Sequence, residues 1–174
     1  MRGFAFSACP LKIAGKKPQF GLEKGALEFV LGIMEVIGVS MSEERFNQRR
    51  GELHVAVKRL HELFSLPESA VIRDAAIHRF EFTFELMWKS LKLYLEHQGL
   101  ETGGPRATLK VAFEHGLIPT REEGDVWLAM LEDRNQTTHT YSEELAIRIF
   151  ARLKETYEPL LSTMEERLQA LVWE

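Results

Sequence analysis

Apolar residues recur every three or four positions along most of the chain, a spacing typical of helices that bury one face. The first such stripe predicts a helix from about Met41 to a stop at Pro67, and it comprises Phe46, Leu53, Val57, Leu60 and Phe64. A longer helix is predicted from about Ser69 to Gln98. This second helix carries two apolar stripes, so it is either central within one bundle or shared with a second chain.

Turn and capping signals divide the rest of the chain into further helices. Gly99 ends the long helix, and Pro105 suits the first position of a short third helix that ends at Gly116. Thr120, with a glutamate three residues later, predicts the start of a fourth helix. We expect this helix to break after Arg134, because the threonines that follow compete for backbone hydrogen bonds.

A fifth helical segment is predicted from Ser142, and its apolar stripe continues through Leu160 despite Pro159. No stretch of the sequence predicts a strand. The sequence therefore predicts an all-α fold, an antiparallel up-and-down four-helix bundle in which the short third helix is an extra element. The chain has 174 residues, of which 45% are hydrophobic, so one domain can bury a sizeable core.

The first forty residues do not share this pattern. We divide the chain into an N-terminal extension, residues 1–40, and a helical bundle domain, residues 41–174. The apolar run at residues 26–39 contains Glu28 and Glu35 and is too short and too charged to span a bilayer, so we predict no membrane association. Residues 1–40 are either a loosely attached extension or sequence that precedes a true start at Met41.

Composition and charge narrow the class of function. A single cysteine, Cys9, excludes an intramolecular disulfide, so we predict a cytoplasmic protein. The net charge of -4 lacks the basic footprint of general duplex binders, so any contact with nucleic acid is local. His54 and His61 lie seven residues apart on one helix face, but no further ligand has a suitable spacing. We predict neither a metal nor another cofactor.

Candidate chemistry gathers in residues 133–141, Asp-Arg-Asn-Gln-Thr-Thr-His-Thr-Tyr, at the predicted helix break. In an unbroken α-helix, Arg134 and His139 would lie about 140° apart, so their convergence on one site depends on that break. In extended chain beyond it, His139 and Tyr141 would point to the same side. The alternative interpretation is purely structural: these polar side chains only cap free carbonyls at a helix end.

This set of side chains suits cleavage of RNA without a metal. The neutral imidazole of His139 would take the proton of a ribose 2′-hydroxyl, whose oxygen attacks the adjacent phosphorus. Arg134 would hold the scissile phosphate and stabilise its developing charge. A two-fold homodimer would supply a second histidine as the acid. Arg106 and Lys110, one turn apart on the third helix, either extend a phosphate track or form a solvated face.

Two segments of the chain resemble the HEPN superfamily, in particular the proteins described as nucleotidyltransferase substrate-binding subunits and as HepT-like toxins. The first is residues 79–92, RFEFTFELMWKSLK, and the second is residues 133–141, which fits that family's Arg-x4-His-x-Tyr signature. The resemblance extends over residues 41–174. It implies a four-helix-bundle homodimer, encoded beside a minimal nucleotidyltransferase with which it forms a toxin and antitoxin pair.

The resemblance also implies residue roles. Arg134 and His139 match the ribonuclease pair, and Asn135 matches a group that orients this pair or contacts phosphate. Tyr141 matches the phenol that the partner transferase modifies with adenylate, which adds bulk and negative charge where the RNA phosphate binds. We therefore expect a HepT-like toxin, a metal-independent endoribonuclease neutralised by adenylylation. The alternative is a non-catalytic substrate-binding subunit of a two-chain nucleotidyltransferase.

Overall fold

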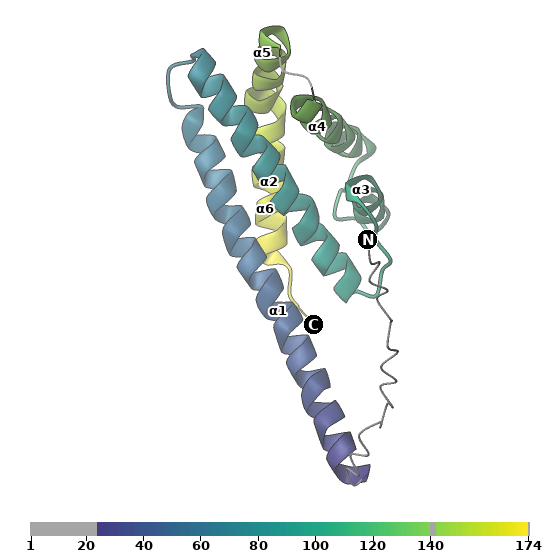
Figure 1. The fold of residues 1–174 in the computed structure, drawn as a ribbon. Coiled ribbons are helices and arrows are strands. Elements are labelled where there is room, and N and C mark those ends of the chain that lie inside the picture. Colours follow the sequence, from purple (N-terminus) through teal and green to yellow (C-terminus); the bar gives the residue numbers. More distant parts are fainter. Residues whose placement is uncertain (1–23, 140–141, 174) are drawn as a thin grey trace, which may run out of the picture. The chain divides into compact units, whose positions relative to one another are not determined.

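The computed structural model describes residues 24–139 and 142–173. The chain divides into two compact units, Met1–Val36 and Ile37–Glu174, and the second contains the helical bundle. Within the described ranges every element is helical, which confirms the all-α prediction (Figure 1). The elements are α1 (Lys24–Leu63), α2 (Ala70–His97), α3 (Pro105–Glu114), α4 (Arg121–His139), α5 (Glu143–Arg152), η1 (Leu153–Tyr157) and α6 (Glu158–Ala170).

The first helix begins at Lys24, so its predicted start near Met41 is wrong. Residues 24–40 contain no proline, so no residue in this stretch breaks a helix, although its three glycines and five valines and isoleucines lower its helix propensity. Extending an existing helix adds one hydrogen bond per residue, so the helix that carries Phe46 continues towards the N-terminus. The division into an extension, 1–40, and a bundle domain, 41–174, stays a prediction. Residues 1–23 lie outside the described residues.

The core of the bundle lies between α1, α2 and the C-terminal helices. The predicted stripe of α1 is buried, with Phe46, Leu53 and Leu60 fully inaccessible. On α2 the first predicted stripe, Ile77, Phe80, Phe84, Met87, Leu91 and Tyr94, is also buried except for the half-buried Tyr94. In the second predicted stripe, Phe82, Leu86 and Leu93, Leu86 is buried and Phe82 is 57% exposed. Because α2 packs against α3, α4, α5 and α6, it is a central helix within one chain.

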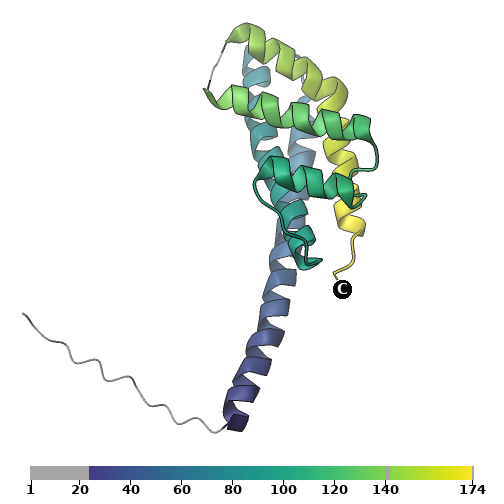
Figure 2. The ribbon, with the colours of Figure 1, turned by 90° about the vertical axis from the view of Figure 1, so that its right-hand side faces the viewer.

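The third and fourth helices cross the central helix α2 of the bundle. Figure 2 shows α3 and α4 running across α2 rather than alongside it. The direction of α4 is set at both ends: Glu123 in its first turn accepts hydrogen bonds from Arg167 of α6, and its last turns contact α2. Gly99 and Gly116 end α2 and α3 with positive φ values of 76° and 78°, as the glycine signals predicted.

The C-terminal segment is helical as predicted, but it is not one regular α-helix. A π-helical turn, η1, separates α5 from α6 immediately before Pro159. Proline has no backbone N–H and its ring crowds the preceding turn, so the regular ladder of hydrogen bonds is interrupted there. The consequence is that Tyr157, in η1, turns into the core and is only 2% exposed.

Candidate active site

Arg134 lies on the last turns of α4, with its side chain about one-third exposed. Its guanidinium reaches α2, where Nη2 is 3.4 Å from Oε2 of Glu85. The other terminal nitrogen, Nη1, donates to the side-chain oxygen of Asn135 at 3.2 Å. The structure therefore brings together two of the predicted site residues, Arg134 and Asn135, and adds Glu85 to them.

Glu85 is itself fixed by its neighbours on α2. Its carboxylate accepts a hydrogen bond from Trp88 Nε1 at 2.9 Å and pairs with Lys89 Nζ at 2.7 Å. Burial alone would raise the pKa of Glu85, but the hydrogen bonds from Lys89 and Trp88 and the charges of Lys89 and Arg134 outweigh burial and lower it. Glu85 is therefore an anion that holds the guanidinium of Arg134 in one place.

Sequence reasoning missed this role of Glu85. The spacing of Glu85 and Lys89 indicates a pair along one helix, which the structure contains. The contact with Arg134 spans 49 positions and depends on how α4 crosses α2, which no local pattern encodes. The resemblance to the HEPN superfamily included residue 85 within its first segment, and that was the only signal that pointed to this position.

Thr137 ties the same end of α4 to α2. Its hydroxyl donates to Glu81 and also lies 2.9 Å from the carbonyl oxygen of Arg134. The single hydroxyl proton is thus shared between Glu81 and the carbonyl of the preceding helical turn, and the helix is not interrupted. This accommodation is one reason why α4 continues past Arg134.

The predicted helix break between Arg134 and His139 is wrong, because α4 extends without interruption to His139. Over five helical residues, positions 134 and 139 are about 140° apart around the helix axis. The next helix starts only after Ser142, whose Oγ accepts from the backbone N–H of Leu145 at 3.2 Å. The side chain of His139 and the whole of Tyr141 lie outside the described residues, and their predicted roles stay predictions.

Asp133, the first residue of the predicted motif, faces the interior instead of the site. It is 3% exposed and accepts hydrogen bonds from Tyr157 Oη at 2.8 Å and from Arg152 Nη1 at 2.9 Å. These contacts tie the C-terminal half of α4 to α5 and η1. Asp133 is therefore a structural anchor for the helix segment that carries Arg134.

Burial, followed by the hydrogen bond to Asp133, raises the pKa of Tyr157 from 10.0 to about 12. Since the unfolded chain releases this proton first, the stabilisation is fully present below about pH 10 and is lost as the pH rises through about 12. We expect the loss to reach at most about 3 kcal/mol. Urea unfolding at pH 9 and pH 11 should show a larger loss of stability for the wild type than for Tyr157→Phe.

The two histidines considered for a metal site have other partners. His54 Nδ1 lies 3.2 Å from Glu165 Oε1, and His61 Nδ1 lies 3.0 Å from Glu158 Oε1. Each pair links α1 to α6, with a largely exposed imidazole and a buried carboxylate. Among the side chains that the structure describes, no group of three or more His, Cys, Asp or Glu could hold a metal ion.

No helix within residues 24–139 and 142–173 is long and apolar enough to cross a membrane.

Comparison with known proteins agrees with the geometry of the bundle. A model of the family described as nucleotidyltransferase substrate binding protein like matches residues 48–170. That range includes the Arg134 site and runs from the C-terminal part of α1 to the end of α6. The chain belongs to this family, which confirms the resemblance inferred from the two sequence segments.

The chain is also similar to two individual proteins. It is 34% identical over 97 residues to a protein of Haemophilus influenzae named probable ribonuclease HepT, a match that covers 49% of this chain and 63% of that protein. It is also similar to a crystal structure of a Thermus thermophilus protein, with 44% identity and a TM-score of 0.61. That match covers 67% of this chain and 98% of the other. The chain thus resembles the HepT-like proteins of the HEPN superfamily.

Proposed function

We propose that this protein is a metal-independent endoribonuclease of the HepT-like toxin type. The observation that carries the proposal is the Arg134 guanidinium, held on the last turns of α4 beside Asn135 and five positions before His139. Arg134 binds the scissile phosphate, and His139 removes the proton of the 2′-hydroxyl, whose oxygen attacks the phosphorus. The bond from phosphorus to the 5′-oxygen of the next nucleotide breaks, and that oxygen takes up a proton and leaves as a 5′-hydroxyl, which leaves a 2′,3′-cyclic phosphate on the other product. The similarity to a protein named probable ribonuclease HepT supports this assignment.

The Glu85–Arg134 pair supports a binding role for the guanidinium. Both side chains are about one-third exposed and their nearest charged atoms are 3.4 Å apart, so the pair is a weak one. An RNA phosphate offers two oxygens to the planar guanidinium and forms stronger, charge-assisted hydrogen bonds. Glu85 thus keeps the guanidinium of Arg134 in position until an RNA phosphate takes the place of the Glu85 carboxylate.

The unbroken α4 favours a site that two copies of the chain build together. Positions 134 and 139 of one helix lie about 140° apart, so one copy supplies the arginine and a second copy the histidine of each site. Phe82 of α2 is 57% exposed and lines a groove together with Val55 and Arg59 of α1. An exposed aromatic side chain of this kind supports a homodimer.

Modification of Tyr141 switches off the proposed ribonuclease. A nucleotidyltransferase encoded nearby transfers adenylate from ATP to the Tyr141 hydroxyl and releases pyrophosphate, and the added phosphate repels the RNA phosphate at Arg134. The protein and the transferase then form a toxin and antitoxin pair in the cytoplasm. The family description, which names nucleotidyltransferases, supports a partner of this class.

One experiment tests both parts of the proposal. The protein is purified alone and after co-expression with the neighbouring nucleotidyltransferase, and each sample is incubated with single-stranded RNA in excess chelator. We expect cleavage by the first sample, because no metal takes part, and little cleavage by the second. Mass spectrometry of the second sample should find one adenylate on the peptide that contains Tyr141.

Two variants serve as controls in the co-expression arm. Tyr141→Phe should keep RNA cleavage and lose the modification. Tyr94→Phe, a change at a half-buried tyrosine on α2, should be modified and cleave little, as the co-expressed wild type does. A wild-type protein that neither cleaves RNA nor carries adenylate would exclude the proposed enzyme. It would identify the chain instead as a non-catalytic substrate-binding subunit of the transferase.

A further inference from the structure

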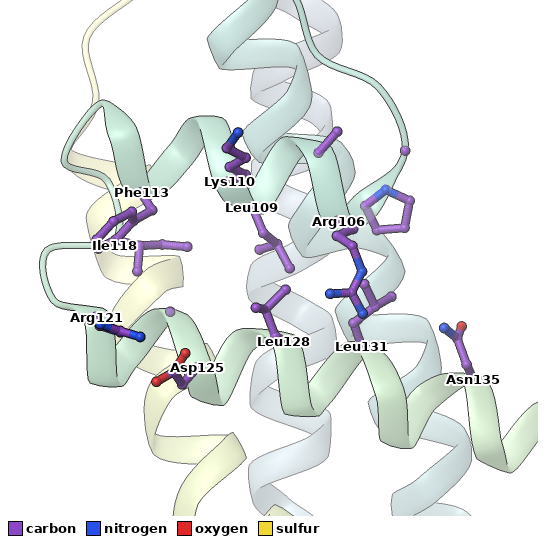
Figure 3. Close-up of a pocket in the computed structure, with 14 residues that line it drawn as sticks. Arg106, Leu109, Lys110, Phe113, Ile118, Arg121, Asp125, Leu128, Leu131 and Asn135 are labelled. Atoms are coloured by element: carbon purple, nitrogen blue, oxygen red, sulfur yellow. The ribbon is translucent and has the colours of Figure 1, made fainter.

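A cavity of about 820 Å³ lies between α3 and α4, next to the site described above. Its walls are apolar: Leu109 and Phe113 come from α3, and Leu128 and Leu131 come from α4. Figure 3 shows Leu109 and Leu128 facing each other across the middle of the cavity. Its volume falls within the range of about 300–1,000 Å³ that is usual for sites of small organic ligands.

The rim of this cavity is positively charged. Arg106 and Lys110 stand on α3 and Arg121 begins α4, while Asp125 is the one carboxylate among the described residues that line the cavity. This excess of cations contrasts with the net charge of -4 of the whole chain. An apolar interior with a cationic rim fits a ligand that joins a flat apolar group to an anion.

The rim cations are available for such an anion. Arg106 Nη2 lies 3.4 Å from Glu132 Oε1, and both side chains are more than 60% exposed. Lys110 Nζ lies 3.6 Å from Glu114 in a similarly exposed pair. Exposed pairs of this kind contribute little stability, so a phosphate can replace the glutamate at small cost. The phosphate-track interpretation of Arg106 and Lys110 is therefore compatible with their contacts.

Asn135 connects the cavity to the proposed active site. Its side chain lines the cavity at the end of α4 nearest Arg106, as Figure 3 shows. The oxygen of the same amide accepts the hydrogen bond from Arg134 Nη1 at 3.2 Å. A ligand in the cavity and a phosphate at Arg134 are therefore neighbours along α4.

We propose that this cavity is a nucleotide subsite, which holds one base and one phosphate of single-stranded RNA next to the bond that is cut. The base lies between Leu109 and Leu128, and its phosphate is bound by Arg106 beside Asn135. The role in RNA binding rests on the proposed ribonuclease function. A free mononucleotide has the same chemistry as a nucleotide within RNA, so the test must separate these two sources.

Apolar contact with a base is tolerant of sequence, because every base has two flat faces. Phe113, 43% exposed, adds an aromatic ring to the end of the cavity distant from Asn135. A hydrophobic helix from a partner protein would use the apolar walls but gain nothing from three cations on the rim. Charge complementarity therefore favours a nucleotide over a helix as the occupant.

The binding test uses the full chain with His139→Ala, so that RNA is bound but not cut. Leu128→Trp fills the cavity, and Arg106→Ala removes a rim cation. Arg45→Ala is the matched control, because Arg45 is an exposed arginine on α1 that does not line the cavity. The probes are a fluorescent single-stranded RNA oligomer, adenosine monophosphate and inorganic phosphate, measured by anisotropy and calorimetry.

We expect Leu128→Trp and Arg106→Ala each to weaken RNA binding about tenfold, because each removes one base or phosphate contact. Arg45→Ala should change it less than about twofold. Adenosine monophosphate should bind weakly and lose affinity in the same two variants, and inorganic phosphate should respond to Arg106→Ala alone. If the two variants weaken binding of adenosine monophosphate but not of RNA, the cavity still binds a nucleotide, and its ligand is a free mononucleotide.

Unchanged affinity for both RNA and adenosine monophosphate in both variants would overturn the inference, and so would binding of an apolar peptide in their place. Circular dichroism checks the fold of Leu128→Trp, and the exposed Arg106→Ala carries the test if that variant unfolds. Failure of this subsite leaves the ribonuclease proposal intact, because cleavage is tested separately through His139. Conversely, cavity-dependent binding by a protein that does not cut RNA would refute the function alone.

Discussion

Replacement of His139 by alanine should reduce cleavage of single-stranded RNA by about 100- to 10,000-fold, the usual range for loss of a general base. The cause is that the 133–139 segment contains no second histidine to act as the base, so the 2′-hydroxyl keeps its proton. Because His139 is the last residue of α4 and alanine is favourable in helices, the helical circular-dichroism signal should not change. The measurement is a time course of oligonucleotide cleavage in excess chelator.

His115→Ala is the matched control for this prediction. His115 is an exposed histidine that follows α3 and does not line the cavity, so its loss should leave cleavage within about twofold of the wild type. Equal activity of His139→Ala and His115→Ala would show that the imidazole at position 139 is not the base.

The same variant tests whether each site uses two copies of the chain. Arg134→Ala and His139→Ala should both be inactive alone. When the two are mixed under conditions that exchange subunits, a heterodimer contains one site with an intact arginine from one copy and an intact histidine from the other. Partial recovery of cleavage is therefore expected. An inactive mixture would favour a site built within one chain.

The helices could be predicted from the sequence because their signals are local. Gly99 and Gly116 both adopt the left-handed conformation that ends a helix, and Ser142 caps α5 as its sequence pattern indicated. The apolar stripe of α1 is buried where the spacing placed it. Local periodicity also made α2 two-sided, but only the packed structure shows that it is central within one chain.

The predicted helix break is wrong because tertiary contacts outweigh the low helix propensity of the threonines. Threonine lowers helix stability by only a few tenths of a kcal/mol in isolation. In the folded chain, Thr137 donates a hydrogen bond to Glu81 of α2, and Asp133 accepts one from the buried Tyr157. These two contacts with other helices stabilise the last turns of α4. Contacts with α2, α5 and η1 thus extend α4 to His139.

The candidate site could be predicted only in part for the same reason. Arg134 and Asn135 are adjacent in sequence and remain together in the structure. The contact of Glu85 with Arg134 and the cavity beside α3 depend on how α4 packs across α2 and alongside α3 (Figure 2). The sequence predicted an antiparallel up-and-down bundle and does not encode this packing. Residues on two helices that meet only because the helices cross have no characteristic spacing in the sequence.

The anchor of α4 provides the largest expected effect on stability. Asp133→Ala should lower the free energy of unfolding by about 3 kcal/mol, because it leaves the buried hydroxyl of Tyr157 without its acceptor and Arg152 without its carboxylate. Arg152 is about half exposed and can turn to water, so most of the loss comes from Tyr157. Urea denaturation followed by circular dichroism measures the change.

Glu132→Ala is the neighbouring control for this prediction. Glu132 is exposed and forms a surface pair with Arg106, so its removal should change stability by less than about 0.5 kcal/mol. Asp133→Ala combined with Tyr157→Phe should cost less than the sum of the two single changes, since both remove the same hydrogen bond. If Asp133→Ala and Glu132→Ala cost the same, the buried bond does not anchor α4. The position of Arg134 would then depend on its contacts with α2 alone.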